Sequence, residues 1–345
     1  MHRFSILLVA GFLLLPAVAF AGGTEEETND VFRVGVFVPA GAVEGSPTYE
    51  MLVEGATRAV EEVEGAEIKV VEGGYNQALW EEGLAGMAAT GEYDVLVTSN
   101  PSMPALAASV AERFPEERFL VMDGYLEDNP QIHTVLYNQR EQAFLVGYFA
   151  GLVTTGDMEF ANPDLRVGLL AGQEYPIMND VILPSFQMGA RSINANIEVD
   201  FRVLGNWNDA AKAGELATSM IDRGVDVILT IAGSGNQGVV GAARSRGAYV
   251  LWFDSAGYAV APRFVVGSAV VRQDLATYER VAAAIRGELE FGKAEILGVR
   301  EGFVDFADED PLYELHVPQD VRSEMADLIA RMQSGDLHLD MQLSF

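Results

Sequence analysis

Residues 205–254 read GNWNDAAKAGELATSMIDRGVDVILTIAGSGNQGVVGAARSRGAYVLWFD, and this stretch decides the fold class. Two apolar runs, 225–233 and 249–255, alternate with two segments of helical periodicity, 208–223 and 237–246. The apolar residues of the first helix share one face: Ala213, Leu216, Ala217, Met220 and Ile221. Short apolar strands separated by helices predict a parallel sheet with helices on both faces.

The same alternation extends in both directions and occurs twice. Upstream in the second unit lie a strand at 166–173, a helix at 180–195 and a strand at 197–205. The first unit has predicted strands at 32–39, 66–74, 93–100, 118–124 and 132–138, with helices around 52–63, 76–90 and 103–113. A long helix around 141–154 leaves this first unit. Two doubly wound α/β units predict two lobes with a ligand cleft between them.

Length and composition exclude several classes of protein. The chain has 345 residues, which favours two domains, and 49% of them are hydrophobic, as in globular proteins. It contains no cysteine and only four histidines without metal-ligand spacing, so we expect no disulfide and no metal site. The net charge of −29 argues against nucleic acid as a partner, because phosphates would be repelled. The chain has many aspartate and glutamate residues and few lysines. This composition fits either a high-salt habitat or a compositional bias of the genome.

The N-terminus has the pattern of a secretory signal peptide. Residues 1–21 combine Arg3, an apolar run and the small-x-small sequence Ala19-Phe20-Ala21. Residues 22–31 are polar and acidic, which is typical of a disordered tether. We expect an exported, periplasmic protein that begins near Gly22 and carries no lipid; the alternative is a retained membrane anchor.

The loops that follow the predicted strands carry the candidate ligand-binding residues. In doubly wound sheets, ligands bind outside the carboxyl ends of the strands. Turn geometry alone explains many of the glycine, asparagine and aspartate residues there, but not the aromatic ones. The aromatic residues expected at this edge are Tyr49, Tyr75, Tyr125, Tyr175, Trp207 and Tyr258. Aromatic rings beside amides and carboxylates suit a flat polar ligand such as a nucleobase or a sugar.

One motif has a competing explanation. GSGNQG, residues 233–238, matches the dinucleotide fingerprint G-x-G-x-x-G, with Asp254 at a suitable distance. It follows the third strand of its unit rather than the first, and an exported chain meets no nicotinamide pool. We therefore expect these glycines to let backbone N–H groups approach a ligand. No nucleophile elbow, zinc-protease motif or P-loop occurs, so no catalytic residue is nominated.

Residues 34–62, VGVFVPAGAVEGSPTYEMLVEGATRAVEE, and 205–254 resemble the basic membrane protein family of ABC-transporter substrate-binding proteins. The resemblance covers about residues 32–310, and its best-understood members are receptors for purine nucleosides. It implies the type I periplasmic-binding-protein fold: two α/β lobes joined by three strands, with a hinge and an interlobe cleft. We expect an N-terminal lobe of 32–139 plus about 272–292 and a C-terminal lobe of 140–271 plus about 293–345.

The resemblance also implies roles for individual residues. Asp123 corresponds to the family's purine-binding aspartate, and Asp254 to the aspartate expected on the ribose hydroxyls. Trp207 corresponds to an aromatic residue that is either a stacking wall or a packing residue. Gly233 and Gly235 correspond to the family's glycine turn.

Other positions depart from the family pattern. Thr48 and Tyr49 stand where phenylalanine and asparagine are usual, and Arg272 lies near the place of an expected lysine. The lipid-attachment cysteine is absent. The predicted ligand-binding set is Thr48, Tyr49, Asn100, Asp123, Tyr175, Trp207, Gly233, Gly235, Asp254 and Arg272.

The function predicted from these features is that of a monomeric receptor that binds a small nucleoside-like solute and delivers it to an ABC permease in the membrane. No cofactor is expected. Two alternatives remain: a sensor that presents its ligand to a membrane receptor, and an exported α/β enzyme that acts on a nucleoside or sugar.

Overall fold

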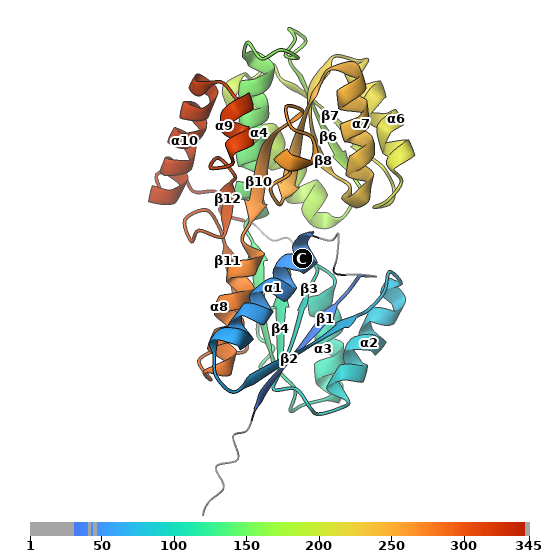
Figure 1. Ribbon diagram of the computed structural model, residues 1–345, viewed down its shortest axis with the longest axis vertical. Coiled ribbons are helices and arrows are strands. Elements are labelled where there is room, and N and C mark those ends of the chain that lie inside the picture. Colours follow the sequence, from blue (N-terminus) through green and yellow to red (C-terminus); the bar gives the residue numbers. More distant parts are fainter. Residues whose placement is uncertain (1–30, 41–42, 44–46, 342–345) are drawn as a thin grey trace, which may run out of the picture. The chain divides into compact units, whose positions relative to one another are not determined.

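The two predicted doubly wound units are present as two six-stranded sheets, each covered by helices (Figure 1). The computed structural model describes residues 31–40, 43 and 47–341. The predicted signal peptide, 1–21, and the tether up to residue 30 lie outside the described residues. From Val31 onward the chain forms one compact unit that contains both lobes.

The sheet of the first lobe has the strand order β2-β1-β3-β4-β5-β11, and all its neighbouring strands are parallel. Its strands are β1 (Phe32–Val38), β2 (Ala66–Glu72), β3 (Val95–Ser99), β4 (Phe119–Met122), β5 (Ile132–Tyr137) and β11 (Ala294–Leu297). Its helices are α1 (Pro47–Glu62), α2 (Trp80–Ala88), α3 (Met103–Arg113) and α8 (Gln273–Ile285), with a 3₁₀ turn η1 (Gln77–Leu79).

The sheet of the second lobe has the order β7-β6-β8-β9-β10-β12, in which β12 alone is antiparallel among the described strands. Its strands are β6 (Arg166–Ala171), β7 (Glu198–Val203), β8 (Val225–Ile231), β9 (Tyr249–Asp254), β10 (Val265–Val271) and β12 (Val304–Phe306). Its helices are α4 (Gln139–Thr155), α5 (Leu183–Ile193), α6 (Ala210–Ile221), α7 (Asn236–Arg246), α9 (Pro311–His316) and α10 (Gln319–Ser334). Short turns η2 (Met178–Ile182), η3 (Gly233–Gly235) and η4 (Tyr258–Val260) complete it.

The local sequence explains these elements and their ends. Strand β8, VDVILTI, is buried along its whole length, as expected of a central parallel strand covered on both faces. Helix α6 begins where the Asp209 side chain accepts a hydrogen bond from the Lys212 N–H (2.9 Å). Helix α7 ends at Gly247, whose φ of 77° lies in the left-handed region that favours glycine. The alternation seen in residues 205–254 is thus confirmed as α6-β8-α7-β9.

The chain crosses between the lobes at three places: from β5 into α4, from β10 into α8, and from β11 to β12. Helix α8 packs on α1 of the first lobe. One boundary was wrong. Residues from about 293 onward were expected in the second lobe, but β11 pairs in parallel with β5 of the first sheet. The last crossing therefore follows Leu297, because the short run Ala294–Leu297 extends the first sheet before the chain returns.

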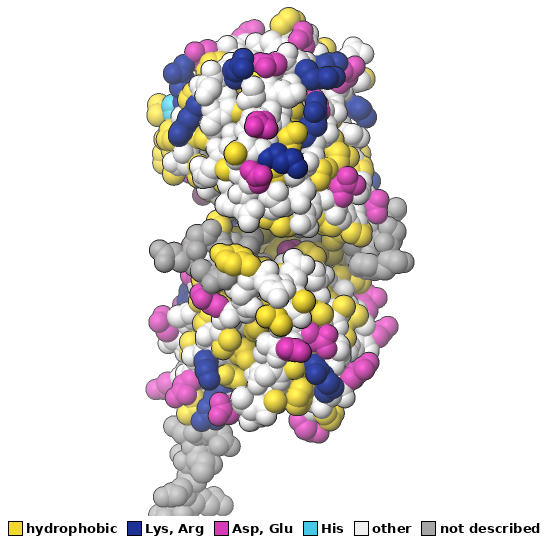
Figure 2. Space-filling model, turned by 90° about the vertical axis from the view of Figure 1, so that its right-hand side faces the viewer, with side chains coloured by type: hydrophobic (Ala, Val, Ile, Leu, Met, Phe, Trp, Pro, Cys, Tyr) yellow, Lys and Arg dark blue, Asp and Glu magenta, His cyan; other side chains and the backbone are white. Residues whose placement is uncertain are grey.

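Charged side chains are scattered over the visible face of both lobes (Figure 2). Figure 2 shows one face, on which acidic and basic groups are interspersed and which is hollowed between the lobes. This distribution is the solvated surface expected of a chain with 51 acidic residues. Within the described part of the chain, no helix is both long enough and apolar enough to cross a membrane.

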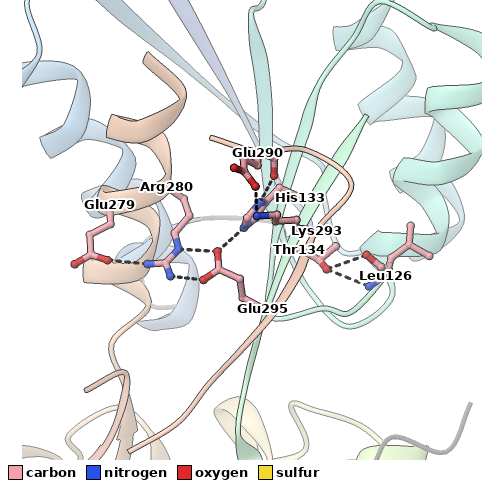
Figure 3. Close-up of polar contacts among 8 residues, drawn as sticks. All are labelled: Leu126, His133, Thr134, Glu279, Arg280, Glu290, Lys293 and Glu295. Atoms are coloured by element: carbon pink, nitrogen blue, oxygen red, sulfur yellow. Dashed lines mark hydrogen bonds and ion pairs between the residues drawn. The ribbon is translucent and has the colours of Figure 1, made fainter. Parts of the chain in front are cut away.

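A polar cluster joins β5, α8 and β11 in the first lobe (Figure 3). The buried His133 ring lies 2.8 Å from the Glu290 carbonyl through Nδ1 and 2.7 Å from Glu295 Oε1 through Nε2. Arg280 of α8 donates to Glu295 Oε2 (2.7 Å) and to Glu279 (2.7 Å). We call this cluster the His133–Glu295–Arg280 network. It connects β11 and α8 to β5, and β11 and α8 each lie next to a crossing between the lobes.

Candidate functional site

Two aspartates occupy equivalent places in the two lobes. Asp123 directly follows β4, and Asp254 ends β9; each of these strands is fourth in its sheet. Both residues have positive φ, 52° for Asp123 and 69° for Asp254. Residues other than glycine seldom adopt this conformation, and those that do are concentrated at functional sites. The paired geometry therefore marks these two strand ends as the candidate site.

The two carboxyl groups are close enough to influence each other's ionisation. Burial and then the negative charge of Asp254 raise the pKa of Asp123 to about 8. Burial raises the pKa of Asp254 to about 6, although a hydrogen bond from Gln142 opposes the rise. Asp254 loses its proton first, so Asp123 is still neutral at that stage, and the repulsion acts on Asp123 alone. Asp254 is therefore the carboxyl that ionises first and accepts hydrogen bonds, and Asp123 is the one that keeps its proton to higher pH and can also donate.

Several buried polar atoms around these carboxyl groups lack a partner among the described residues. They are Asp123 Oδ1, Tyr137 Oη and Gln142 Oε1. Burial, and then the charges of Asp123 and, to a smaller extent, Asp254, raise the pKa of Tyr137, so its hydroxyl is within electrostatic range of both. Buried polar atoms are normally hydrogen-bonded, so unpartnered ones at the base of a site call for donors and acceptors from a ligand or water.

The first lobe contributes a connected set of side chains beside Asp123. Asn100, after β3, donates through Nδ2 to the Tyr49 hydroxyl of α1 (3.2 Å). Burial raises the pKa of Tyr49 to about 12, with Asp123 as a further cause. Thr48 takes part through its carbonyl, which accepts a hydrogen bond from Gln273 Nε2 (2.6 Å). The structure thus groups Tyr49, Asn100 and Asp123. Thr48 contacts Gln273 through its backbone carbonyl.

The second lobe contributes an aromatic wall. Trp207 and Tyr175 lie with ring centroids 6.2 Å apart, and Trp207 is 37% exposed. The indole lies flat on Gly172, where a Cβ would come within 2.4 Å of the ring. Gly233, at φ 58°, passes so close to the Trp207 carbonyl that a Cβ there would lie 2.7 Å from the oxygen. Burial, followed by the charges of Asp254 and Asp123, raises the pKa of Tyr175, so its hydroxyl is within electrostatic range of both carboxyl groups.

The glycine turn η3 (Gly233–Gly235) packs against the Trp207 backbone. The Gly235 N–H donates to the Ala232 carbonyl (3.0 Å) and reaches the Trp207 carbonyl (3.4 Å). Gly235 is buried, and a Cβ there would meet Leu204 at 2.8 Å. The Gly235 N–H, expected to approach a ligand, is therefore already engaged within the lobe, because the turn packs against Leu204 and Trp207.

Two other residues lie apart from the carboxyl groups. Arg272 pairs with Asp274 (3.7 Å) and lines a separate cavity of about 630 Å³ formed with β12, residues 307–310 and α10. Tyr258, expected at the strand edge, is completely buried, with its ring centroid 6.0 Å from that of Tyr313. The expectation for Tyr258 was wrong, because η4 folds the residue back into the core of its own lobe.

Three residues of the site were missed in the sequence: Tyr137, Gln142 and Gln273. Gln142 Nε2 donates to Asp254 Oδ1 (3.1 Å) and to the Ala269 carbonyl (3.2 Å). Gln273 links α1 to the end of β3 by accepting from the Ser99 hydroxyl (3.3 Å). The only sequence signal for them was a polar residue at a position that the helical or strand pattern assigns to the core.

This chain is similar to several known proteins in sequence or in fold. A solute-binding protein of an ABC transporter system from Aeropyrum pernix K1 has the same fold, with a TM-score of 0.76 at 22% identity over 91% of this chain and 94% of that one. The CD4+ T-cell-stimulating antigen of Listeria monocytogenes is 21% identical over 266 residues, 72% of this chain and 71% of that protein. The ABC transporter nucleoside-binding protein BmpA of Lactococcus lactis is 26% identical over 156 residues, 44% of this chain and 41% of that protein.

A family model covers nearly the whole described part of the chain. It is the Bmp model, described as an ABC transporter substrate-binding protein, PnrA-like, and it matches residues 32–338. The matched range includes both sheets and every residue of the candidate site. The chain therefore belongs to the Bmp family of ABC-transporter substrate-binding proteins.

Proposed function

We propose that this protein is the extracytoplasmic receptor of an ABC importer and that it binds a purine nucleoside or a similar small polar solute between its lobes. It would pass this solute to a membrane permease as a monomer. The observation that carries the proposal is the pair of aspartates at equivalent strand ends, beside buried polar atoms that have no partner in the described part of the chain. The name of the Lactococcus relative, a nucleoside-binding protein, supports the choice of ligand.

The chemistry of the site matches such a ligand in three ways. A protonated Asp123 both donates and accepts, which suits the ring nitrogens and exocyclic group of a base. An ionised Asp254 accepts from two neighbouring hydroxyls, as a ribose presents them. Trp207 and Tyr175 offer ring faces to a flat heterocycle.

Calorimetry on ligand-free protein at pH 7 tests the proposal directly. The panel contains purine and pyrimidine nucleosides, free bases and pentoses, and one purine nucleoside is expected to bind per chain. Mass spectrometry of small molecules released by denaturing the purified protein identifies any retained ligand. If no nucleoside binds and the released molecule is of another class, the nucleoside assignment fails.

Trp207 is expected to report ligand binding by fluorescence. The other two tryptophans, Trp80 and Trp252, are buried, at 4% and 9% exposure, so a ligand in the cleft changes mainly the surroundings of Trp207. Trp207→Phe should remove most of the fluorescence change and retain partial affinity, since stacking on a base contributes about 1–3 kcal/mol. Trp80→Phe, in the first lobe, is the control and should keep the signal. A Trp207→Ala variant that binds as tightly as wild type would make Trp207 a packing residue.

A further inference from the structure

Gln142 lies beside Asp254. So far it has no role in the proposed site, because it is not among the residues proposed to contact the ligand. It belongs to the first turns of α4, just after the chain crosses from β5 into the second lobe. The side chain is completely buried. Its Nε2 group bridges the Asp254 carboxylate and the Ala269 carbonyl of β10, at 3.1 and 3.2 Å. Both N–H groups of the amide thus have acceptors, on two neighbouring strands.

We infer that Gln142 is a positioning residue that fixes Asp254 as a hydrogen-bond acceptor and thereby makes the site select ligands with paired hydroxyl donors. Ala269 is part of β10, so the bridge holds the amide in one orientation. The amide in turn holds Asp254 Oδ1, whose backbone is already confined to a positive φ. A carboxylate fixed in this way presents its remaining lone pairs in a defined direction.

The surroundings of Asp254 leave Gln142 as its hydrogen-bond donor. The groups whose pKa the charge of Asp254 raises are Asp123 after β4, Tyr137 of β5 and Tyr175 after β6, and none of these is a cation. Arg272 follows β10, the strand beside β9, and forms its ion pair with Asp274 (3.7 Å). Burial raises the pKa of Asp254, and the hydrogen bond from Gln142 is the influence that lowers it. Without Gln142, the carboxyl would hold its proton to a higher pH and become a donor itself.

The oxygen of the same amide extends this preference. Gln142 Oε1 is buried and has no partner among the described residues. Because Oε1 and Nε2 belong to the same amide, this second acceptor lies close to the Asp254 carboxylate that Nε2 contacts. Two neighbouring acceptors match two neighbouring hydroxyls and leave a ligand without hydroxyls unable to satisfy either of them.

The first measurement needs no ligand. Aspartate carboxyls are labelled with ¹³C and titrated by NMR in wild type, Gln142→Met and Gln142→Leu, with Asp254 assigned by the loss of its signal in Asp254→Asn. The pKa of Asp254 should rise in both Gln142 variants. Each variant removes the Nε2 donor and fills its place with an apolar side chain of similar size. An unchanged pKa would overturn the inference.

The second measurement rests on the proposed nucleoside function. Adenosine and 2′,3′-dideoxyadenosine are compared by calorimetry, and wild type should prefer adenosine by about tenfold or more. Gln142→Met should weaken adenosine binding about tenfold and shrink this preference. An unchanged preference overturns the selectivity. If neither compound binds while the Asp254 pKa still rises, the nucleoside function fails and the positioning role stands.

Thr154→Val is the matched control for general damage to α4. Thr154 lies on the same helix, is buried, and donates to another buried carboxylate, Asp226 (2.9 Å), away from the site. This variant should lower the melting temperature and leave both the adenosine preference and the Asp254 pKa unchanged. If Thr154→Val changes the preference as Gln142→Met does, the effect belongs to the helix and the inference fails.

Discussion

Replacing Asp254 by alanine is expected to raise the dissociation constant for a purine nucleoside about tenfold to a hundredfold or more. The reason is that the carboxylate would accept hydrogen bonds from ligand hydroxyls, and each hydrogen bond to a charged group contributes about 1.5–3 kcal/mol. Calorimetry at pH 7 measures the effect. In wild type the affinity should also fall below about pH 6, where Asp254 gains its proton.

The same substitution should leave the melting temperature of ligand-free protein unchanged or higher. Burial raises the pKa of Asp254 from 3.8 to about 6, so the folded protein binds this proton more tightly than the unfolded chain. Stability from this group is therefore present at low pH and is lost as the pH rises through about 6. At pH 7 the ionised carboxylate opposes folding, and its removal relieves that opposition. A clear fall in melting temperature with unchanged affinity would instead make Asp254 a structural residue.

Asp226→Asn provides the comparison. Asp226 of β8 is a second buried carboxylate of the same lobe, and it accepts from Thr154 Oγ1 and from the Asn162 N–H, both at 2.9 Å. These partners belong to α4 and to the loop before β6, not to the candidate site. The variant should change stability and leave affinity at the wild-type value. A loss of affinity equal to that of Asp254→Ala would show that neither effect is specific to the site.

The strand ends of the site could be predicted from the sequence because their signals are local. The apolar run of β9 stops at Asp254, and that of β4 stops before Asp123, so the position of each aspartate follows from the pattern of its own strand. The doubly wound topology then brings such strand ends to one edge of each sheet. The positions of these two aspartates could therefore be predicted from the order of residues along the chain, without knowing their tertiary contacts.

The supporting residues could not be predicted because their partners are distant in the chain. Gln142 bonds Asp254 across 112 positions, and nothing in the sequence around a helical glutamine indicates such a partner. Tyr137 ends an apolar run and is indistinguishable there from a core residue. Strand β11 has four residues, too few for its pattern to show which sheet it joins. Its place depends on its pairing with β5, a tertiary contact.

Removing His133 is expected to reduce the free energy of unfolding more than any other single change outside the hydrophobic core. The ring is 3% exposed, and its two nitrogens contact the Glu290 carbonyl and Glu295 Oε1. His133→Leu leaves both acceptors without their partner. Loss of one member of such a pair destabilises by about 3–5 kcal/mol when it is fully buried. Glu295 is one-third exposed, so we expect about 2–4 kcal/mol.

Denaturant unfolding followed by circular dichroism measures this change, and Lys293→Ala is its control. Lys293 pairs with Glu290 in the same part of the lobe, but both side chains are more than half exposed. An exposed pair of this kind contributes about 0–1 kcal/mol. If His133→Leu is no more destabilising than Lys293→Ala, then the His133–Glu295–Arg280 network does not hold β11 and α8 in place.

The acid dependence of stability separates this network from simple packing. Burial alone would raise the pKa of Glu295, but hydrogen bonds from His133 and Arg280 outweigh it and lower the pKa to about 2. A carboxyl whose pKa is lower in the folded state stabilises the protein above its unfolded pKa, near 4.5, and that contribution is lost as the pH falls toward 2. Glu295→Gln should therefore remove part of the wild-type loss of stability between about pH 4.5 and pH 2. Parallel stability curves for the two proteins over that range would mean that the ionised Glu295 does not stabilise the folded lobe.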